Sequence, residues 1–348
     1  MNSHTVPQKL LKQFAYDDLR TKSLRLYCYQ KDIPPYPVFP KRATAFEGYF
    51  SDPDNPAKEN EIETRLNNEF ENPVHRFLSE IGNPSFALTD QHRSQFTRYL
   101  TLLFWRSEAL RNARKHFQHV TLQAIQQFRS NEAQLLTVTA KWNIDRLFSG
   151  CPQHFLETRQ DIIRTLNRLA QIYQTERNRQ KSYVESIERW MNEFDNVMYE
   201  GQWEFLRTSA DNPFIISDAP VVTWERKEDG ELSYGIGVHE PNVEVLLPVS
   251  PLTCLHVLPN VARNRHIKQP TVREINIAQA AFAHKHCFTN IKSSQINEIV
   301  QQNFGKAEIG VKAFTVSHIN YSNAVYEHLM KPINESTLLS YRPSNRRI

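Results

Sequence analysis

The sequence predicts an α+β protein in which a long-helix middle region is inserted between strand-bearing N- and C-terminal parts. Apolar residues at helical spacing dominate residues 61–200, and short apolar stretches separated by turn residues dominate residues 201–259. Near the start, residues 23–31 alternate between apolar and polar side chains as a strand does. Two arrangements stay open for the strands of the two ends, namely separate sheets or one sheet shared across the helical insertion.

The N-terminal part, residues 1–60, is expected to hold one short helix and two strands. Pro7 stands at the first helical position, and Leu10, Leu11 and Phe14 follow at helical spacing. The strands are predicted over residues 23–31 and 44–50. Between them, residues 32–40 include four prolines and are predicted to be a loop.

Three helical stretches are predicted within residues 61–200. The first covers residues 61–81. The second is capped by Thr89 or Asp90 and runs from residue 91 to about residue 128. The longest part of the third covers residues 161–194, and its paired charges are typical of a solvated helix face.

Residues 201–335 are predicted to mix strands with two helices. The expected strands are residues 203–209, 213–217, 220–226, 232–238, 243–249 and 253–259. The expected helices are residues 271–286 and 294–304. Residues 336–348 carry little periodicity and are predicted to be a mobile tail.

Composition excludes several classes of protein. Nine glycines in 348 residues is about a third of the usual share, and the glycine-rich motifs of dinucleotide-binding, P-loop and α/β-hydrolase proteins do not occur. The four cysteines stand far apart, which argues against a zinc site or a disulfide framework. The start resembles no signal peptide, and the mean hydropathy of −0.58 predicts no membrane span. We therefore expect a cytoplasmic protein, and a net charge of +4 by itself implies no partner.

Four short motifs follow one another along the chain. They are His4-x-x-Pro7-x-x-x-Leu11-x-x-Phe14, the pair Glu63 and Glu69, Ser217-Asp218-x-Pro220, and Leu247-Pro248-Val249-Ser250-Pro251. In this order they resemble the bacterial family called domain of unknown function 4238. That family also has an arginine late in a long helix, usually followed by Thr-Pro. Here Arg106 is followed by Ser107 and Glu108, so this match is partial. The resemblance implies a shared fold and no established activity.

Arg106 is the strongest functional candidate that the residues themselves provide. Projected on a helix, it falls among apolar residues such as Tyr99, so its guanidinium is expected to be buried and paired with a carboxylate. Glu63 or Glu69 is the expected partner. Two roles stay open, a structural ion pair between helices and a site arginine that binds phosphate or an anionic transition state.

The other motif residues carry the same ambiguity. Glu63 and Glu69 lie about 120° apart on one helix, so they serve either one site or a solvated face. Asp218 follows an apolar strand, where it acts either as a catalytic carboxylate or as a turn residue that binds backbone N–H groups. His4 stands at a helix N-terminus and is either a ligand or base or an exposed, inert side chain.

If these residues converge, they form a hydrolytic site. His4, Glu63, Glu69, Arg106 and Asp218 would supply the catalytic groups, Glu69 and Asp218 would bind Mg²⁺ or Mn²⁺, and Arg106 would stabilise charge on a phosphate. Such a set is typical of metal-dependent nucleases and phosphohydrolases.

The long second helix adds a nucleic-acid signal. Residues 92–130 hold seven Arg or Lys and one acidic residue, and Arg93, Arg111 and Lys115 are expected on the face that would hold a phosphate backbone. The same cations alternatively pair with the acidic residues 59–71. Arg111 and His116 also have the spacing found in metal-independent HEPN ribonucleases, although strands do not suit that fold. His284 and His286 are expected at a helix end without a metal role.

These observations support two functional hypotheses. The first is a metal-dependent, nuclease-like hydrolase of nucleic acid or nucleotides, in the setting of a toxin or phage-defence effector. The second is a non-catalytic module that binds nucleic acid or protein, with the same polar residues in a buried structural network. In the first, Asp218, a glutamate and His4 meet in an open cleft, and in the second each is paired and closed to solvent.

Overall fold

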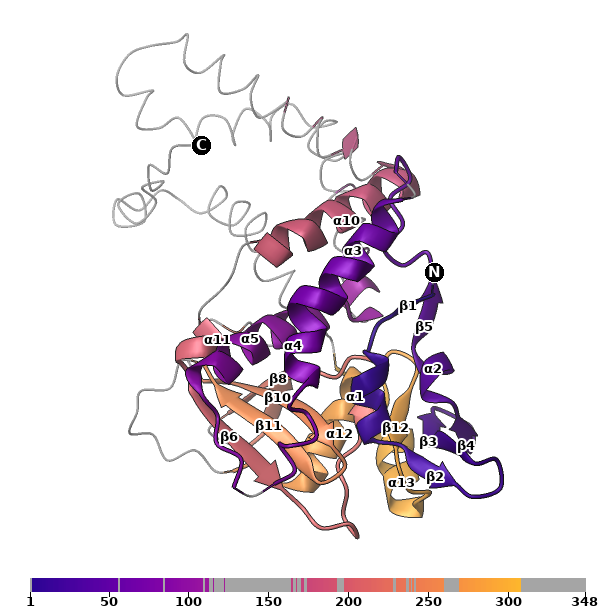
Figure 1. Cartoon of the computed structure of the whole chain (residues 1–348), viewed down its shortest axis with the longest axis vertical. Helices are drawn as coiled ribbons and strands as arrows, with labels where there is room; N and C mark the ends of the chain where they lie inside the picture. The colour runs from indigo at the N-terminus through magenta and orange to yellow at the C-terminus, as the bar shows by residue number, and fades with distance from the viewer. Residues whose placement is uncertain are drawn as a thin grey trace, which may run out of the picture. The chain divides into compact units, whose positions relative to one another are not determined.

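The computed structural model describes residues 2–112 and 174–307, apart from positions 56, 84, 109, 193–196, 228–229, 236–237, 239, 241 and 260–268, together with isolated positions between 115 and 171 (Figure 1). Contacts divide the chain into two compact units, residues 1–118 with 174–313 and residues 119–173 with 314–348. Every helix and strand below belongs to the first unit. The predicted tail at residues 336–348 lies outside the described residues, and the predicted boundaries near residues 60, 200 and 335 stay predictions.

Helices and strands alternate irregularly, as expected for an α+β chain. The N-terminal elements are β1 (Asn2–His4), α1 (Gln8–Gln13), β2 (Tyr16–Asp18), β3 (Ser23–Gln30), β4 (Ile33–Val38), α2 (Pro40–Ala43) and β5 (Ala45–Glu47). The helical part has α3 (Lys58–Arg65), the π-helical turn η1 (Leu66–Glu71), α4 (Asn72–His75), α5 (Asp90–Trp105), α10 (Glu176–Asn192) and α11 (Val197–Glu200). The C-terminal elements are β6 (Gln202–Arg207), β7 (Ile216–Ser217), β8 (Val222–Arg226), β9 (Leu232–Tyr234), β10 (Val243–Ser250), β11 (Thr253–Leu258), α12 (Val272–Phe282), β12 (Cys287–Thr289) and α13 (Ser294–Asn303).

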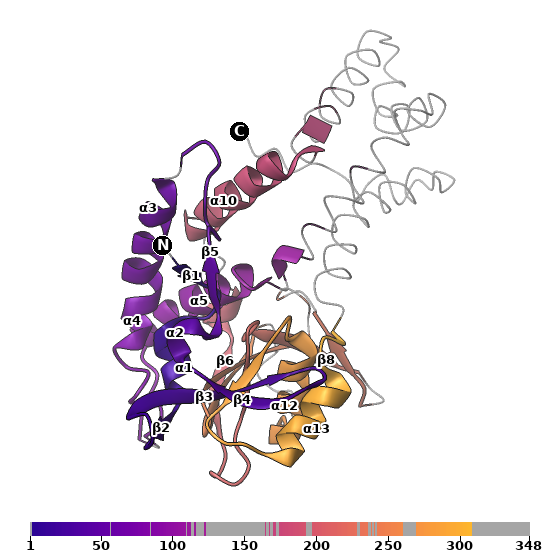
Figure 2. The same cartoon turned by 90° about the vertical axis from the view of Figure 1, so that its right-hand side faces the viewer.

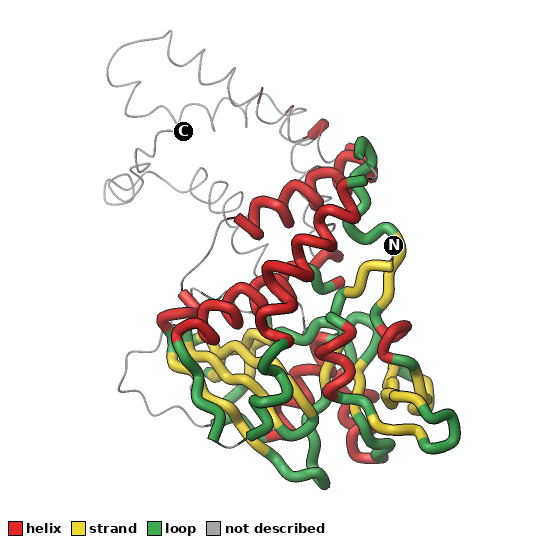
Figure 3. The backbone as a smooth tube through the Cα atoms, in the orientation of Figure 1, coloured by secondary structure: helices red, strands yellow, loops and turns green. Residues whose placement is uncertain are grey.

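The larger sheet is antiparallel and has the strand order β6-β11-β10-β8-β9. Because side chains alternate along a strand, Leu255 and Val257 of β11 join α1 and α5 in one core, while Cys254 packs with α12 in another. The tube in Figure 3 shows these strands in yellow and the helices in red. The sheet is thus buried on both faces.

The two ends of the chain share the smaller sheet, which has the order β2-β3-β12-β7 with β4 beside β3. Cys28 of β3 lies opposite Phe288 of β12, and β12 pairs in turn with β7. The α+β prediction is therefore confirmed, and of the two arrangements left open the shared sheet is the one that forms. Figure 2 shows β3 and β4 in front of α12 and α13.

Four predicted elements differ from the observed ones. Residues 33–38 form strand β4 and not a loop, because an edge strand tolerates proline where no ladder hydrogen bond is needed. Helix α5 ends at Trp105, and most of the rest of the predicted helix, to about residue 128, lies outside the described residues. The predicted helix 61–81 ends at His75 and includes the π-helical turn η1. Helix α12 ends at Phe282, so residues 284–286 form a loop that leads into β12.

The described cysteines, Cys28, Cys254 and Cys287, are free and buried. Burial raises the pKa of the Cys28 thiol to about 12, and it also raises the pKa values of the Cys254 and Cys287 thiols. None of the described helices has the length and apolar character that a bilayer crossing needs.

Candidate functional site

Arg106 lies at the C-terminal end of α5 and is buried, as predicted. Its Nη1 is 2.6 Å from Oε1 of Glu71, and its Nε donates to the carbonyl oxygen of Thr5 at 2.9 Å. Burial lowers the pKa of Arg106, but the charges of Glu71 and Glu63 outweigh it and the net shift is upward. The guanidinium therefore stays charged and joins the N-terminal segment to two helices.

The predicted partner of Arg106 is wrong, since Glu71 and neither Glu63 nor Glu69 forms the ion pair. A π-helical turn has more residues per turn than an α-helix. In η1 the residue that faces Arg106 is therefore Glu71, and a projection on a regular α-helix does not identify it. Glu63 is buried and acts on Arg106 through its charge. Glu69 is 43% exposed, bonds to Arg65 at 3.0 Å and lies 4.0 Å from Arg98. The predicted glutamate pair is thus split between the core and the surface.

His4 lies in β1, where its Nε2 is 3.0 Å from the carbonyl oxygen of Lys41. The residue after it, Thr5, supplies the carbonyl that accepts from Arg106. The opening motif is therefore held beside Arg106 by the backbone carbonyl of Thr5, and the imidazole of His4 contacts Lys41 instead.

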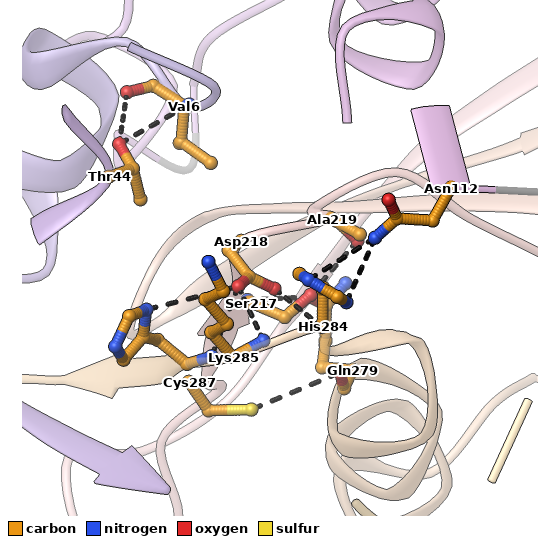
Figure 4. A network of polar contacts seen from close by, with 11 residues as sticks. Val6, Thr44, Asn112, Ser217, Asp218, Ala219, Gln279, His284, Lys285 and Cys287 are labelled. Atoms are coloured by element: carbon orange, nitrogen blue, oxygen red, sulfur yellow. Dashed lines mark hydrogen bonds and ion pairs between the residues drawn. The ribbon is translucent and has the colours of Figure 1, made fainter. Parts of the chain in front are cut away.

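Asp218 follows β7 and is buried, with both carboxylate oxygens engaged by one loop. Oδ1 accepts from the backbone N–H of His284 at 2.8 Å, and Oδ2 accepts from those of Lys285 at 2.7 Å and His286 at 3.1 Å. Burial raises the pKa of Asp218 to about 6 even though these three bonds lower it. Figure 4 shows the carboxylate of Asp218 beside His284 and Lys285. Asp218 therefore binds backbone N–H groups, as the turn interpretation expected, but those of a distant loop.

The rest of the Ser217-Asp218-Ala219-Pro220 motif docks on α12. Gln279 accepts from the backbone N–H of Ser217 at 2.9 Å and donates to the carbonyl oxygen of Pro220 at 2.8 Å. These groups are buried, so the motif holds β7, α12 and the 284–286 loop in one arrangement.

The 284–286 loop is the place where distant parts of the chain meet. Nδ2 of Asn112 lies 3.2 Å from Nε2 of His284 (Figure 4). Nζ of Lys285 lies 4.9 Å from the centre of the Phe46 ring. Burial lowers the pKa of His284, and Glu108 opposes that shift. The sequence interpretation missed this loop because it extended the preceding helix to residue 286.

The structure does not assemble the predicted metal pair. Glu69 is engaged by arginines, and both oxygens of Asp218 accept backbone N–H bonds. Across the described residues, no group of three or more His, Cys, Asp or Glu side chains could hold a metal ion. The described donors therefore do not fit Mg²⁺ or Mn²⁺, and we derive no chemistry through a metal.

The three cations that were expected to bind nucleic acid, Arg93, Arg111 and Lys115, each contact other groups of the protein. Arg93 donates to the carbonyl oxygen of Gly201 at 3.4 Å, and Lys115 lies 3.5 Å from Glu176. Arg111 donates to Gln180 at 2.7 Å, and its guanidinium lies 4.5 Å from the ring centre of Tyr49. His116, the second residue of the ribonuclease spacing, lies outside the described residues.

A carboxylate–imidazole–carboxylate row crosses the larger sheet, with His256 and Glu244 buried and the side chain of Glu204 40% exposed. His256 of β11 places Nδ1 2.7 Å from Glu204 of β6 and Nε2 2.9 Å from Glu244 of β10. Burial lowers the pKa of His256, but the two carboxylates outweigh it, so the pKa is raised. A histidine and a glutamate inside otherwise apolar strands were the signal in the sequence, and the sequence interpretation did not use it.

A family model described as "Protein of unknown function (DUF4238)" matches residues 2–293, which is most of the chain. Neither the curated proteins nor the solved structures gave a significant match.

Proposed function

The chain belongs to the family of domain of unknown function 4238, and since that description assigns no activity, we propose from the geometry that the protein is a non-catalytic module that binds nucleic acid. The observation that carries the proposal is the closure of two motif residues, Arg106 and Asp218, to solvent. Arg106 is 1% exposed and Asp218 is 5% exposed, and each is bonded to protein groups. The binding-module hypothesis requires these side chains to be paired and closed to solvent. The hydrolase hypothesis requires them to line an open cleft, which does not agree with their burial.

The distribution of charge supports nucleic acid as the ligand. Eight of the 42 Lys and Arg residues and three of the 38 Asp and Glu residues lie in residues 1–42. This segment therefore carries +5, while the remaining 306 residues carry −1. A local excess of cations on a nearly neutral chain is typical of a surface that binds phosphates. A cytoplasmic location accompanies this proposal.

The test is a binding titration with fluorescently labelled RNA and DNA at several salt concentrations. The variant Lys12→Gln/Lys41→Gln/Arg42→Gln removes three exposed cations of the basic segment, and Lys306→Gln removes one exposed cation elsewhere as the control. We expect the triple variant to bind more weakly at low salt and with a salt dependence reduced by up to about three charges. Wild-type protein that binds no nucleic acid, or a triple variant that binds like the control, would refute the proposal.

A nuclease-like hydrolase, of the kind found in toxins and phage-defence effectors, is the second candidate. One observation favours it. The half-buried His284 contacts Asn112 and is followed by the exposed Lys285, on a loop whose backbone N–H groups bind Asp218. A neutral imidazole beside a cation suits proton transfer at a phosphate ester. The test incubates end-labelled RNA and DNA with Mg²⁺, Mn²⁺ or EDTA. Cleavage that His284→Gln abolishes, with an unchanged melting temperature, would select this candidate.

A further inference from the structure

The N-terminal strands carry aromatic rings on one face of the smaller sheet. Tyr16 of β2 stacks on Tyr27 of β3, with ring centres 4.7 Å apart and planes inclined by 13°. The guanidinium of Arg25 lies 3.4 Å from the centre of the Phe39 ring. We call Tyr16, Arg25, Tyr27 and Phe39 the ring surface.

Strand register explains why these side chains share a face. Tyr16 lies opposite Arg25, and Tyr27 follows Arg25 at the two-residue period of a strand. Leu26 and Cys28 alternate with them and point into the core. Phe39 comes one residue after Val38, which pairs with Leu26, so Phe39 lies level with Arg25.

The ring surface is open to solvent at one end. Helix α13 packs on Tyr29, which donates to the carbonyl oxygen of Ile291, and so covers the far end of the same strand face. Beyond it, Phe39 is 36% exposed, and Tyr16 and Arg25 are half-buried. Over the described residues, apolar rings therefore reach the surface here, beyond the cover of a packing helix.

Cations surround the ring surface. Arg20 and Lys22 are exposed in the turn between β2 and β3, and Lys31 is exposed where β3 ends. The acids nearby are Asp17, Asp18 and Asp32. Asp18 is used within the turn, where it accepts from the N–H of Arg20 and the hydroxyl of Thr21. Residues 16–42, the segment that carries the ring surface, hold six Arg or Lys against these three acids, so the segment has a net charge of +3.

We propose that the ring surface binds single-stranded nucleic acid, with bases stacked on the exposed rings and phosphates held by the surrounding cations. Aromatic rings on an antiparallel sheet are a common platform for unpaired bases, whereas bases in a duplex are stacked on each other and cannot reach them. The inference rests on the proposed nucleic-acid binding and names its surface and its preferred strand state.

The experiment compares Phe39→Ala with Leu252→Ala, because Phe39 and Leu252 are both exposed large apolar side chains and Leu252 lies at the turn between β10 and β11. The probes are labelled oligouridine and oligodeoxythymidine of about 12 nucleotides, within the usual site size, and a duplex of the same length. Wild type is expected to prefer the single strands. Phe39→Ala is expected to weaken that binding by about 5- to 150-fold, the loss of one stacked base, with an unchanged salt dependence. Leu252→Ala is expected to bind like wild type.

The outcomes separate this inference from the proposed function. Two outcomes would overturn the ring-surface inference alone. The first is equal affinity for single strands and duplex, and the second is a Phe39→Ala variant that binds like wild type while the triple cation variant does not bind. No binding by wild type would overturn both. Melting curves check folding, and Tyr16→Leu provides a second ring variant if Phe39→Ala proves unstable.

Discussion

Arg106 and Glu71 form an ion pair whose side chains are 1% and 9% exposed. The change Glu71→Gln leaves the guanidinium charged and buried without its bonded carboxylate, so we expect a loss of up to about 3–5 kcal/mol in the free energy of unfolding, with the charge of Glu63 offsetting part of it. The matched control is Glu69→Gln, the same change in the same π-helical turn but on the surface, where we expect a change of at most about 0.5 kcal/mol. Urea titration measures both. Equal effects would contradict the assignment of Glu71 as the structural partner.

His256 makes stability depend on pH. Its pKa is raised in the fold, so its bonds to Glu204 and Glu244 stabilise fully below the unfolded pKa of about 6.5, and this stabilisation is lost as the pH rises through the folded pKa. At acidic pH the contribution of Glu204 to the free energy of unfolding falls, because its bond to His256 lowers its pKa in the fold and this stabilisation is lost as the carboxylate becomes protonated. We expect the cost of His256→Gln to be largest near pH 6 and to shrink toward alkaline pH.

The matched control for that measurement is His284→Gln, because the pKa of His284 is lowered and its effect has the opposite sign. Wild-type His284 must lose a proton to sit in the fold, so it costs stability as the pH falls below about 6.5, and the variant removes that cost. Urea titrations at several pH values compare the two. A cost of His256→Gln that does not change with pH would contradict an imidazolium between the two carboxylates.

Residue-level prediction from the sequence succeeded for burial and failed for partners. The apolar surroundings of Arg106 along α5 are a local property, and the sequence therefore indicates its burial. Its partner depends on the π-helical geometry of η1, and the partners of Asp218 depend on a loop 66 residues away. Tertiary contacts of this kind leave no periodic signal.

At the scale of elements, the shared sheet joins the two ends of the chain. Cys28 in β3 and Cys287 in β12 are both buried on paired strands. We expect neither thiol to react with maleimide in the native protein, because burial raises both pKa values and excludes the reagent. In a urea series with labelling followed by peptide mass spectrometry, both are expected to react at the same urea concentration. Exposure of Cys287 well before Cys28 would contradict one cooperative sheet.

The elements that the sequence predicted poorly are short or unusual. Three of the six residues of β4 are prolines, so its composition indicated a loop. Strand β12 has only three residues, which are too few for an alternating pattern. The larger strands β10 and β11 were predicted close to their observed bounds, because both are long apolar stretches that end at turns.

For the whole molecule, two buried polar centres hold distant parts of the chain together. The Arg106–Glu71 pair joins the first residues to the helices, and Asp218 joins β7 to the loop before β12. Arg106 and Asp218 are both residues of the family pattern, and each joins parts of the chain that lie far apart in the sequence. The net positive charge is concentrated in the N-terminal 42 residues, at +5 against −1 elsewhere, and this segment is the one that we propose to bind nucleic acid.

The most direct test of this account is a single gel that separates free, bound and shortened RNA after long incubation of wild-type protein with Mg²⁺, Mn²⁺ or EDTA. A binding module with closed motif residues is expected to give RNA that is bound and of full length in every lane. Shortened RNA in any lane would contradict the central claim, and so would the absence of a bound species at low salt.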